Sequence, residues 1–257
     1  MKYISNLSGG RDSTAMTIKL LELKAPLDHI LFCDTGYEFP KMYEYIEKLN
    51  KYIKKAFNKE IEILKPTTSI EEWAFSPFTS GANKGKLRGL PISLGMSYCT
   101  RELKVKRIDD FLKSKKYDEV CFYVGYTHDE VKNGRGSKMP NNFLFPLHKW
   151  KWNELEVTNY LKEKSIYNDL YDDFTRTGCF CCPKQSINSW KTLLNKYPKL
   201  WDWCVELEKK AKEKNCLIQT FRADGIPLKD RELGWRENYL PFDDNWNDSE
   251  VSCFCKF

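Results

Sequence analysis

The residues best suited to holding phosphate occupy positions 8–14, which read Ser-Gly-Gly-Arg-Asp-Ser-Thr. This stretch lies between an apolar segment that predicts a strand (residues 3–7) and a helical pattern (residues 12–24). Two adjacent glycines let the backbone turn tightly and approach a ligand, and the following helix directs its first N–H groups into the turn. An ordinary turn capped by Asp12 or Ser13 is the alternative. The residues predicted to bind nucleotide phosphates are Ser8, Gly9, Gly10, Arg11, Ser13 and Thr14.

Ten cysteines form the second group of residues able to do chemistry. Cys179 and Cys182 have the Cys-x-x-Cys spacing that brings two thiolates onto one metal ion or cluster. Cys253 and Cys255 form another pair near the end of the sequence. Because no secretion signal precedes the first predicted strand, we expect metal binding or redox chemistry rather than a disulfide scaffold. The spacing leaves zinc and an iron–sulfur cluster equally open.

Charged residues near these groups suggest roles in catalysis. Asp12 or Asp34 is a candidate ligand for Mg²⁺, which prefers carboxylates and phosphate oxygens, although either residue also suits a cap. Arg101 and Lys104 are one helical turn apart, so we expect them to share a face and hold an α-phosphate, a sulfate or a substrate anion. An exposed basic face is the alternative. Asp129 is a candidate for binding metal or orienting substrate, with an exposed loop as the alternative.

Strand and helix patterns alternate in the first half of the chain. Predicted strands cover residues 3–7, 29–33, 61–64 and 119–125, and predicted helices include residues 13–23 and 41–57. This alternation predicts a parallel, doubly wound α/β sheet, in which ligands bind at the carboxyl ends of the strands. Three segments follow strands and are expected to meet there: the Ser-Gly-Gly turn, residues 34–36 and residues 125–130. From the last two we predict cofactor binding by Asp34, Thr35, Gly36, Gly125 and Asp129.

The later part of the chain predicts a second unit. We expect a nucleotide-binding α/β domain over residues 1–175 and a helical, cysteine-rich subdomain over residues 176–257. No apolar run approaches membrane length, so we expect a cytoplasmic protein without membrane contact. The net charge of +6 suits a nucleotide or a nucleic acid and does not choose between them. A homo-oligomer stays open.

Several motifs, taken in order, resemble the phosphoadenosine phosphosulfate (PAPS) reductase-like family of the PP-loop superfamily. Residues 8–13 are similar to the PP-loop of ATP pyrophosphatases, Ser-Gly-Gly-x-Asp-Ser. Residues 34–40 resemble the family's Asp-Thr-Gly-x-Glu-Phe-Pro segment, and residues 99–104 its Cys-Thr-x-x-Leu-Lys segment. Residues 125–130 are similar to Gly-x-x-x-Asp-Glu, and residues 178–183 to Gly-Cys-x-x-Cys-Pro. The Asn-Asp-Leu-Tyr segment at 168–171 also fits the family.

The resemblance implies an adenine nucleotide α-hydrolase-like fold that binds ATP or PAPS together with Mg²⁺. It also implies that Cys99 lies near Cys179 and Cys182 in space. With Cys255, or Cys253, as the fourth ligand, these thiolates would hold a 4Fe–4S cluster, which the family favours over Zn²⁺ or metal-free thiols. The expected partners are an adenine nucleotide and a sulfur acceptor, either a nucleic acid or a small molecule.

Members of this family include sulfonucleotide reductases and enzymes that insert sulfur into DNA or tRNA. Reductases tend to have a degenerate PP-loop, whereas the loop is intact here. Those with a mobile catalytic cysteine carry a Glu-Cys-Gly-x-His tail, whereas this chain ends in Cys-Phe-Cys-Lys-Phe. We therefore predict an enzyme that cleaves ATP at the α-phosphate, releases pyrophosphate and supports sulfur transfer. A PAPS reductase and a nucleotide-binding protein without turnover are the alternatives.

Overall fold

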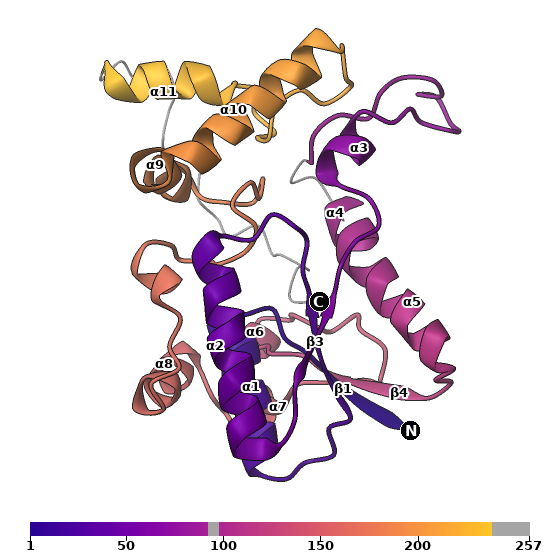
Figure 1. The fold of residues 1–257 in the computed structure, drawn as a ribbon, viewed down its shortest axis with the longest axis vertical. Helices are drawn as coiled ribbons and strands as arrows, with labels where there is room; N and C mark the ends of the chain where they lie inside the picture. The colour runs from indigo at the N-terminus through magenta and orange to yellow at the C-terminus, as the bar shows by residue number, and fades with distance from the viewer. Residues whose placement is uncertain (92–97, 238–257) are drawn as a thin grey trace.

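The computed structural model describes residues 1–91 and 98–237, and a five-stranded parallel sheet forms its centre (Figure 1). The strands lie in the order β3-β2-β1-β4-β5. Their bounds are β1 Lys2–Asn6, β2 His29–Cys33, β3 Ile61–Leu64, β4 Val120–Tyr123 and β5 Phe143–Leu144. The chain builds outward from the central strand β1 through β2 to β3 and then crosses to β4 on the other side. The predicted doubly wound, mostly parallel α/β sheet is confirmed.

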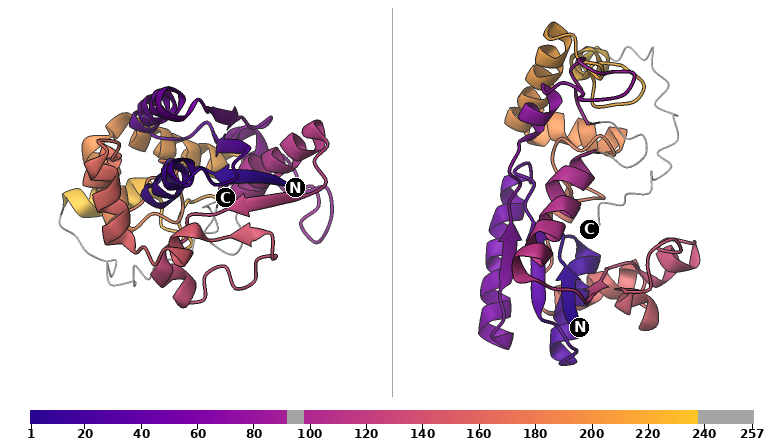
Figure 2. Two further views of the ribbon diagram at one scale, coloured as in Figure 1. Left: turned by 90° about the horizontal axis from the view of Figure 1, so that it is seen from below. Right: turned by 90° about the vertical axis from the view of Figure 1, so that its right-hand side faces the viewer.

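Helices cover both faces of this sheet (Figure 2). On one face, α1 (Arg11–Glu22) and α2 (Pro40–Phe57) bury Met16 and Met42 in the larger apolar cluster. On the other face, α5 (Lys106–Lys115) contributes Ile108 to a second cluster. Covering both faces is the reason that β2 is apolar along its length rather than alternating.

Helices α9, α10 and α11 gather at one end of the molecule, beyond the carboxyl ends of the strands, whereas α7 and α8 contact α1 (Figure 1). The bounds of the remaining helices are α3 Ile70–Ala74, α4 Tyr98–Thr100, the π-helix η1 Arg101–Val105, α6 His128–Lys132, α7 Pro146–Lys149, α8 Glu154–Glu163, the 3₁₀-helix η2 Asp169–Asp172, α9 Ile187–Lys196, α10 Pro198–Glu213 and α11 Leu228–Arg236. The predicted helical character of the last third is confirmed as far as residue 237. No helix in the described ranges is both long and apolar enough to cross a membrane.

Local sequence accounts for the ends of the long helices. Pro40 begins α2 at a position where its missing N–H would have had no partner, and Asn58 ends it in the left-handed conformation with φ 52°. Asn153 and Glu156 form a reciprocal capping box at the start of α8. Strand β5 is not predicted from the sequence, because two residues carry no periodicity; this strand depends on pairing with β4.

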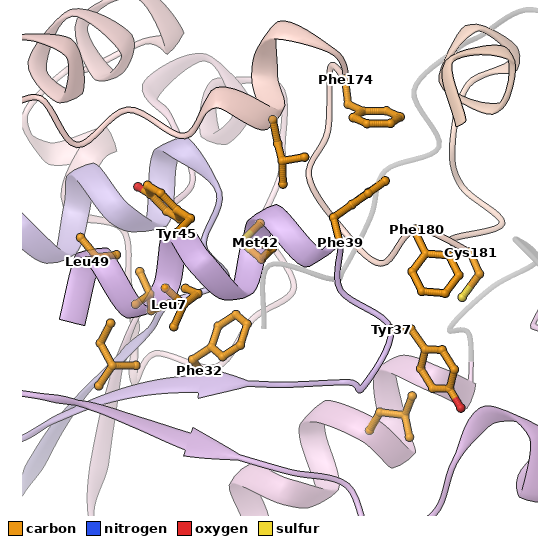
Figure 3. Packing of buried hydrophobic residues seen from close by; sticks show 14 of the residues in the cluster. Leu7, Phe32, Tyr37, Phe39, Met42, Tyr45, Leu49, Phe174, Phe180 and Cys181 are labelled. Carbon is orange, nitrogen blue, oxygen red and sulfur yellow. The ribbon is translucent and has the colours of Figure 1, made fainter. Parts of the chain in front are cut away.

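A continuous apolar cluster joins the sheet to the helices at the end of the molecule. It contains Phe39 at the start of α2 together with Phe174 and Phe180, and the rings of Phe39 and Phe174 lie 4.6 Å apart between centroids (Figure 3). Cys181 lies in the same cluster, beside Phe180 (Figure 3). The cluster therefore includes residues on both sides of the predicted domain boundary at 175/176, and that boundary stays a prediction.

Candidate active site

The Ser-Gly-Gly loop connects the central strand β1 to α1, as expected. Gly9 has φ +75°, a conformation that favours glycine, and a Cβ at this position would lie 2.4 Å from the sulfur of Met42, which would have to move. The Ser8 amide donates to Ser13 Oγ at 3.1 Å, and the two serine hydroxyls lie 3.0 Å apart. Thr14 begins the helical hydrogen bonding, because its amide donates to the Gly10 carbonyl at 3.1 Å. The loop is thus a closed turn at the amino end of a helix, where N–H groups and the helix dipole favour an anion.

The 3₁₀-helix η2 and the residue before it form hydrogen bonds with the Ser-Gly-Gly loop and the start of α1. Asn168 is buried and donates its side-chain amide to the Gly9 carbonyl at 3.1 Å. The Arg11 amide, the first N–H of α1, donates to the Tyr171 hydroxyl at 3.0 Å. From the sequence, this segment is predicted only to fit the family, with no role in the site. The structure shows that it supports the loop.

Arg11 does not extend from the loop as a free cation. Its guanidinium carbon lies 4.3 Å from the centre of the Tyr171 ring, and Nη2 lies 3.3 Å from a carboxylate oxygen of Glu154 in α8. In this conformation Arg11 ties α8 to the loop. Its predicted contact with phosphate would require the side chain to leave both partners.

Gly125 brings the end of β4 against the first turn of α1. A Cβ on Gly125 would lie 2.7 Å from the Ser13 backbone nitrogen and 2.9 Å from the Asp12 carbonyl carbon. Real Cβ atoms do not approach backbone that closely, so glycine permits this packing. The structure gives Gly125 a packing role, and its predicted contact with a cofactor stays a prediction.

The predicted carboxylates occupy three different settings. Asp34 Oδ1 accepts hydrogen bonds from the Gly36 amide and the Tyr43 hydroxyl, both at 2.8 Å, so this carboxylate shapes the turn after β2. Gly36 has φ +83°, which favours glycine there. Asp12 is buried in the first turn of α1, whereas Asp129 is exposed in the first turn of α6. Their predicted binding of Mg²⁺ or substrate stays a prediction.

Thr35 connects the turn after β2 to the cysteine segment. Its hydroxyl donates to Glu38 Oε1 at 2.8 Å and lies 3.1 Å from the sulfur of Cys179. Glu38 is buried, and burial raises the pKa of its carboxyl. Burial also raises the pKa of the Cys179 thiol; the nearby Glu38 raises it further, and the Lys104 ammonium opposes the shift. Glu38 lies in a family motif but is not among the predicted site residues.

A small pocket, with a cavity volume of about 60 Å³, lies between the two cysteine segments. It is lined by Thr35, Ile70, Pro91, Cys99, Thr100, Leu103, Lys104, Arg176, Gly178, Cys179, Cys181, Cys182, Pro183, Lys184 and Gln185. The structure therefore brings Cys99, Cys179 and Cys182 to one pocket, together with Lys104.

Arg101 does not line the cysteine pocket, whereas Lys104 does. The Arg101 side chain is 62% exposed, and its Nε lies 3.0 Å from a carboxylate oxygen of Glu102. The expectation of a shared face assumed an α-helix. Residues Arg101–Val105 instead form a π-helix, whose wider turn changes the relative direction of side chains three positions apart.

Thiols are chemically suitable ligands for a metal ion or an iron–sulfur cluster. Cysteine sulfur is the common ligand of structural zinc and of iron–sulfur clusters, and four cysteines from two distant segments line one pocket. Within residues 1–91 and 98–237, however, no three potential ligands are already grouped closely enough to hold an ion. The predicted fourth ligand, Cys255 or Cys253, lies outside the described residues.

Comparison with known proteins gives several sequence relatives. Two uncharacterized proteins of Methanocaldococcus jannaschii are 27% identical over 227 residues and 25% identical over 238 residues. These matches cover 85% and 89% of this chain but 44% and 53% of the relatives, so the chain spans about half their length. An adenosine 5'-phosphosulfate reductase of Staphylococcus haemolyticus is 23% identical over 199 residues, with 72% of each chain covered.

Two solved structures are similar to this chain at lower sequence identity. The PAPS reductase of Candida auris gives a TM-score of 0.43 at 19% identity, covering 69% of this chain and 80% of its own. The U34-tRNA thiolase NcsA of Methanococcus maripaludis, solved with its 4Fe–4S cluster, gives 0.41 at 15% identity, covering 100% and 79%.

The family model gives the broadest assignment. The model described as "Phosphoadenosine phosphosulfate reductase domain" matches residues 2–185, well over half of the chain. The match includes every motif on which the resemblance was based, from the Ser-Gly-Gly loop to the Cys-x-x-Cys segment. The chain therefore belongs to the PAPS reductase domain family.

Proposed function

We propose that this chain is an enzyme that binds ATP at the Ser-Gly-Gly loop, releases pyrophosphate and supports sulfur transfer at the cysteine pocket. One observation supports this most directly. Thr35 follows β2 at the same sheet edge as the loop, and its hydroxyl touches Cys179 in the pocket wall. A nucleotide at the carboxyl ends of the strands would thus have its phosphates at the loop and the cysteines close by.

The loop suits the leaving group of such a reaction. Backbone N–H groups at the start of α1 and the Ser8 and Ser13 hydroxyls are the donors that would stabilise the charge developing on pyrophosphate. Asp12 or Asp34 would hold Mg²⁺, which would supply positive charge to neutralise the phosphates. An acceptor oxygen attacks the α-phosphorus, the bond from that phosphorus to the bridging oxygen breaks, and the acceptor is left adenylated. A sulfur nucleophile then displaces AMP from the acceptor.

The pocket suits the sulfur step. Cys99, Cys179 and Cys182, with Cys255 or Cys253, are the residues that would hold a 4Fe–4S cluster or Zn²⁺; a cluster would supply electrons or a position for sulfur. Lys104 places a positive charge beside these thiols and would stabilise anionic species there. We propose a nucleic acid or a small molecule as the sulfur acceptor. The proposal is compatible with a homo-oligomer.

The direct test is pyrophosphate release from ATP by the anaerobically purified chain, measured alone and with candidate acceptors. Lys104→Met should lower the rate at least about tenfold, because it removes the positive charge that acts on Cys179 in the pocket. Lys106→Met is the matched control: Lys106 is exposed, pairs with Glu102 and is two residues away. Equal rates for both variants, or no pyrophosphate from the wild type, would contradict the proposal.

The Staphylococcus relative supports a second candidate, a sulfonucleotide reductase. Such an enzyme would release sulfite from PAPS or from adenosine 5'-phosphosulfate in the presence of a thiol reductant, and it would release no pyrophosphate from ATP. A third outcome, tight ATP binding without either product, would assign a binding role without turnover.

A further inference from the structure

A short arm, residues 76–88, carries positive charge that the proposed chemistry does not use. It follows α3 and extends beyond that helix at the edge of the molecule (Figure 1). Its cations are Lys84, Lys86 and Arg88, and the sequence has no aspartate or glutamate between residues 73 and 101. Lys84 and Lys86 are exposed, and neither forms an ion pair within the described part of the chain. This concentration of positive charge suits an anionic partner.

Backbone hydrogen bonds give the arm a defined shape. The Phe78 amide donates to the Lys86 carbonyl at 2.9 Å, and the Gly85 amide donates to the Phe78 carbonyl at 2.9 Å. At the base of the arm, the guanidinium carbon of Arg88 lies 5.0 Å from the ring centres of Trp73 and Phe78. Arg88 therefore stabilises the arm, and the two lysines supply the charge offered to a partner. An arm that is already ordered loses less conformational entropy when it binds.

The end of α10 places two more lysines beside the arm. The Leu217 amide donates to the Leu87 carbonyl at 2.9 Å, which joins the arm to the segment after α10. Lys212 and Lys214 are exposed at this end of α10, and the Lys214 ammonium lies 5.4 Å from the centre of the Phe75 ring. The acid between them is paired with a lysine one turn earlier in α10. Lysines at a helix carboxyl end also complement its dipole, but this does not account for those on the arm.

These lysines form one basic surface next to the cysteine pocket. Its members are Lys84, Lys86, Lys212 and Lys214. Just past the arm, the Leu90 amide donates to the Ile218 carbonyl at 2.9 Å, and the next residue, Pro91, lines the pocket. The chain between Lys86 and Pro91 spans at most about 18 Å. A long anion held on the basic surface would therefore extend towards the pocket.

We propose that the basic surface binds the phosphate backbone of a single-stranded nucleic acid. Ammonium groups attract the regularly repeated phosphates of a strand without reading its sequence. Phe75 and Phe78 are half-buried at this surface, and aromatic rings beside a basic path are typical of single-strand sites. The inference rests on the proposed function for its purpose, because it selects a nucleic acid as the sulfur acceptor. The binding itself requires neither ATP nor a metal.

Fluorescence anisotropy tests this binding with the anaerobic full-length chain. The probes are a labelled single-stranded RNA of about 16 nucleotides and a DNA strand of the same sequence. The double variant Lys84→Ala, Lys86→Ala should weaken binding of the strand at least about tenfold at low salt. It should also reduce the slope of log affinity against log salt by about 1.4, since each phosphate contact contributes about 0.7. The double variant Lys84→Arg, Lys86→Arg should retain both the affinity and the slope.

The double variant Lys48→Ala, Lys55→Ala is the matched control, because both lysines are exposed on α2 and their removal changes the net charge equally. It should leave the affinity and the slope unchanged, and thermal unfolding checks that every variant is folded. Equal weakening in the arm and control variants would overturn the inference. Pyrophosphate release from ATP without binding of either strand would also overturn it and leave the proposed function standing. Strand binding without pyrophosphate release would contradict the proposed function alone.

Discussion

The hydroxyl oxygen of Thr35 lies 3.1 Å from the sulfur of Cys179, although the two residues are 144 positions apart in the chain. Thr35 belongs to the turn that ends β2, and Cys179 belongs to the Cys-x-x-Cys segment before α9. This contact connects the strand edge, where a nucleotide is expected, with the pocket, where sulfur chemistry is proposed. The predictions below test the parts of the site that this contact brings together.

The first prediction concerns the thiols as ligands. Cys179→Ser should lower the metal bound per chain by at least half, because serine oxygen is a poor ligand for iron or zinc compared with thiolate. Cys204→Ala is the matched variant, since Cys204 is fully buried in the core on α10 and does not line the pocket. It should reduce stability while keeping the metal. Metal analysis and absorption spectra of anaerobically purified protein check both, and equal metal loss in the two variants would contradict the assignment.

The second prediction concerns Gly125. Gly125→Ala should destabilise the fold by about 1–3 kcal/mol, because its Cβ would overlap the backbone at Ser13. Gly178→Ala should change stability by less than about 0.5 kcal/mol, since no atom lies within 4 Å of its added Cβ. Urea unfolding of the two variants and the wild type provides the measurement. A neutral Gly125→Ala would show that β4 does not pack on α1 as described.

The third prediction concerns support of the phosphate loop. Tyr171→Phe removes the hydroxyl that accepts the first N–H of α1 and should cost about 0.5–1.5 kcal/mol. Tyr167→Phe removes a hydroxyl from a neighbouring, half-buried tyrosine and should have little effect. Thermal unfolding compares the pair. If both variants match the wild type, the contact with Arg11 does not contribute to stability.

The fourth prediction concerns pH. Burial raises the pKa of Glu208 to about 7 from its usual 4.5, although the Leu228 and Phe221 amides, which donate to this carboxyl, lower it. The folded state therefore binds the proton more tightly than the unfolded state. The contribution of Glu208 to the free energy of unfolding is largest below pH 4.5. It declines as the pH rises towards 7, by up to about 3 kcal/mol.

Glu208→Gln provides the reference for that measurement, because an amide does not titrate. The difference in unfolding free energy, wild type minus variant, should fall between pH 5 and pH 8 in urea titrations. A difference that rises with pH would show that the folded state favours the carboxylate instead.

Much of this architecture could be predicted from local sequence. β2 and β3 have the predicted bounds, because an apolar run between helices carries its own pattern. The Ser-Gly-Gly loop was predictable for the same reason, since glycine and the flanking elements specify the turn locally. The convergence of Cys99 with Cys179 followed from family resemblance and not from spacing.

Other features depend on contacts that no local pattern encodes. The π-helical turn that separates Arg101 from Lys104 has the composition of an ordinary helix. The support of Gly9 by Asn168 joins residues 159 positions apart. Lys184 looks like any other lysine in the sequence, and only the fold shows that it is 9% exposed and lines the same pocket as four cysteines.

The central claim is that the loop between β1 and α1 binds the phosphates of an adenine nucleotide. A crystal structure of the chain with a non-hydrolysable ATP analogue and Mg²⁺ tests it most directly. The account predicts phosphate density within hydrogen-bonding distance of the Gly10 to Ser13 backbone. An empty loop in a crystal whose nucleotide lies elsewhere would contradict it.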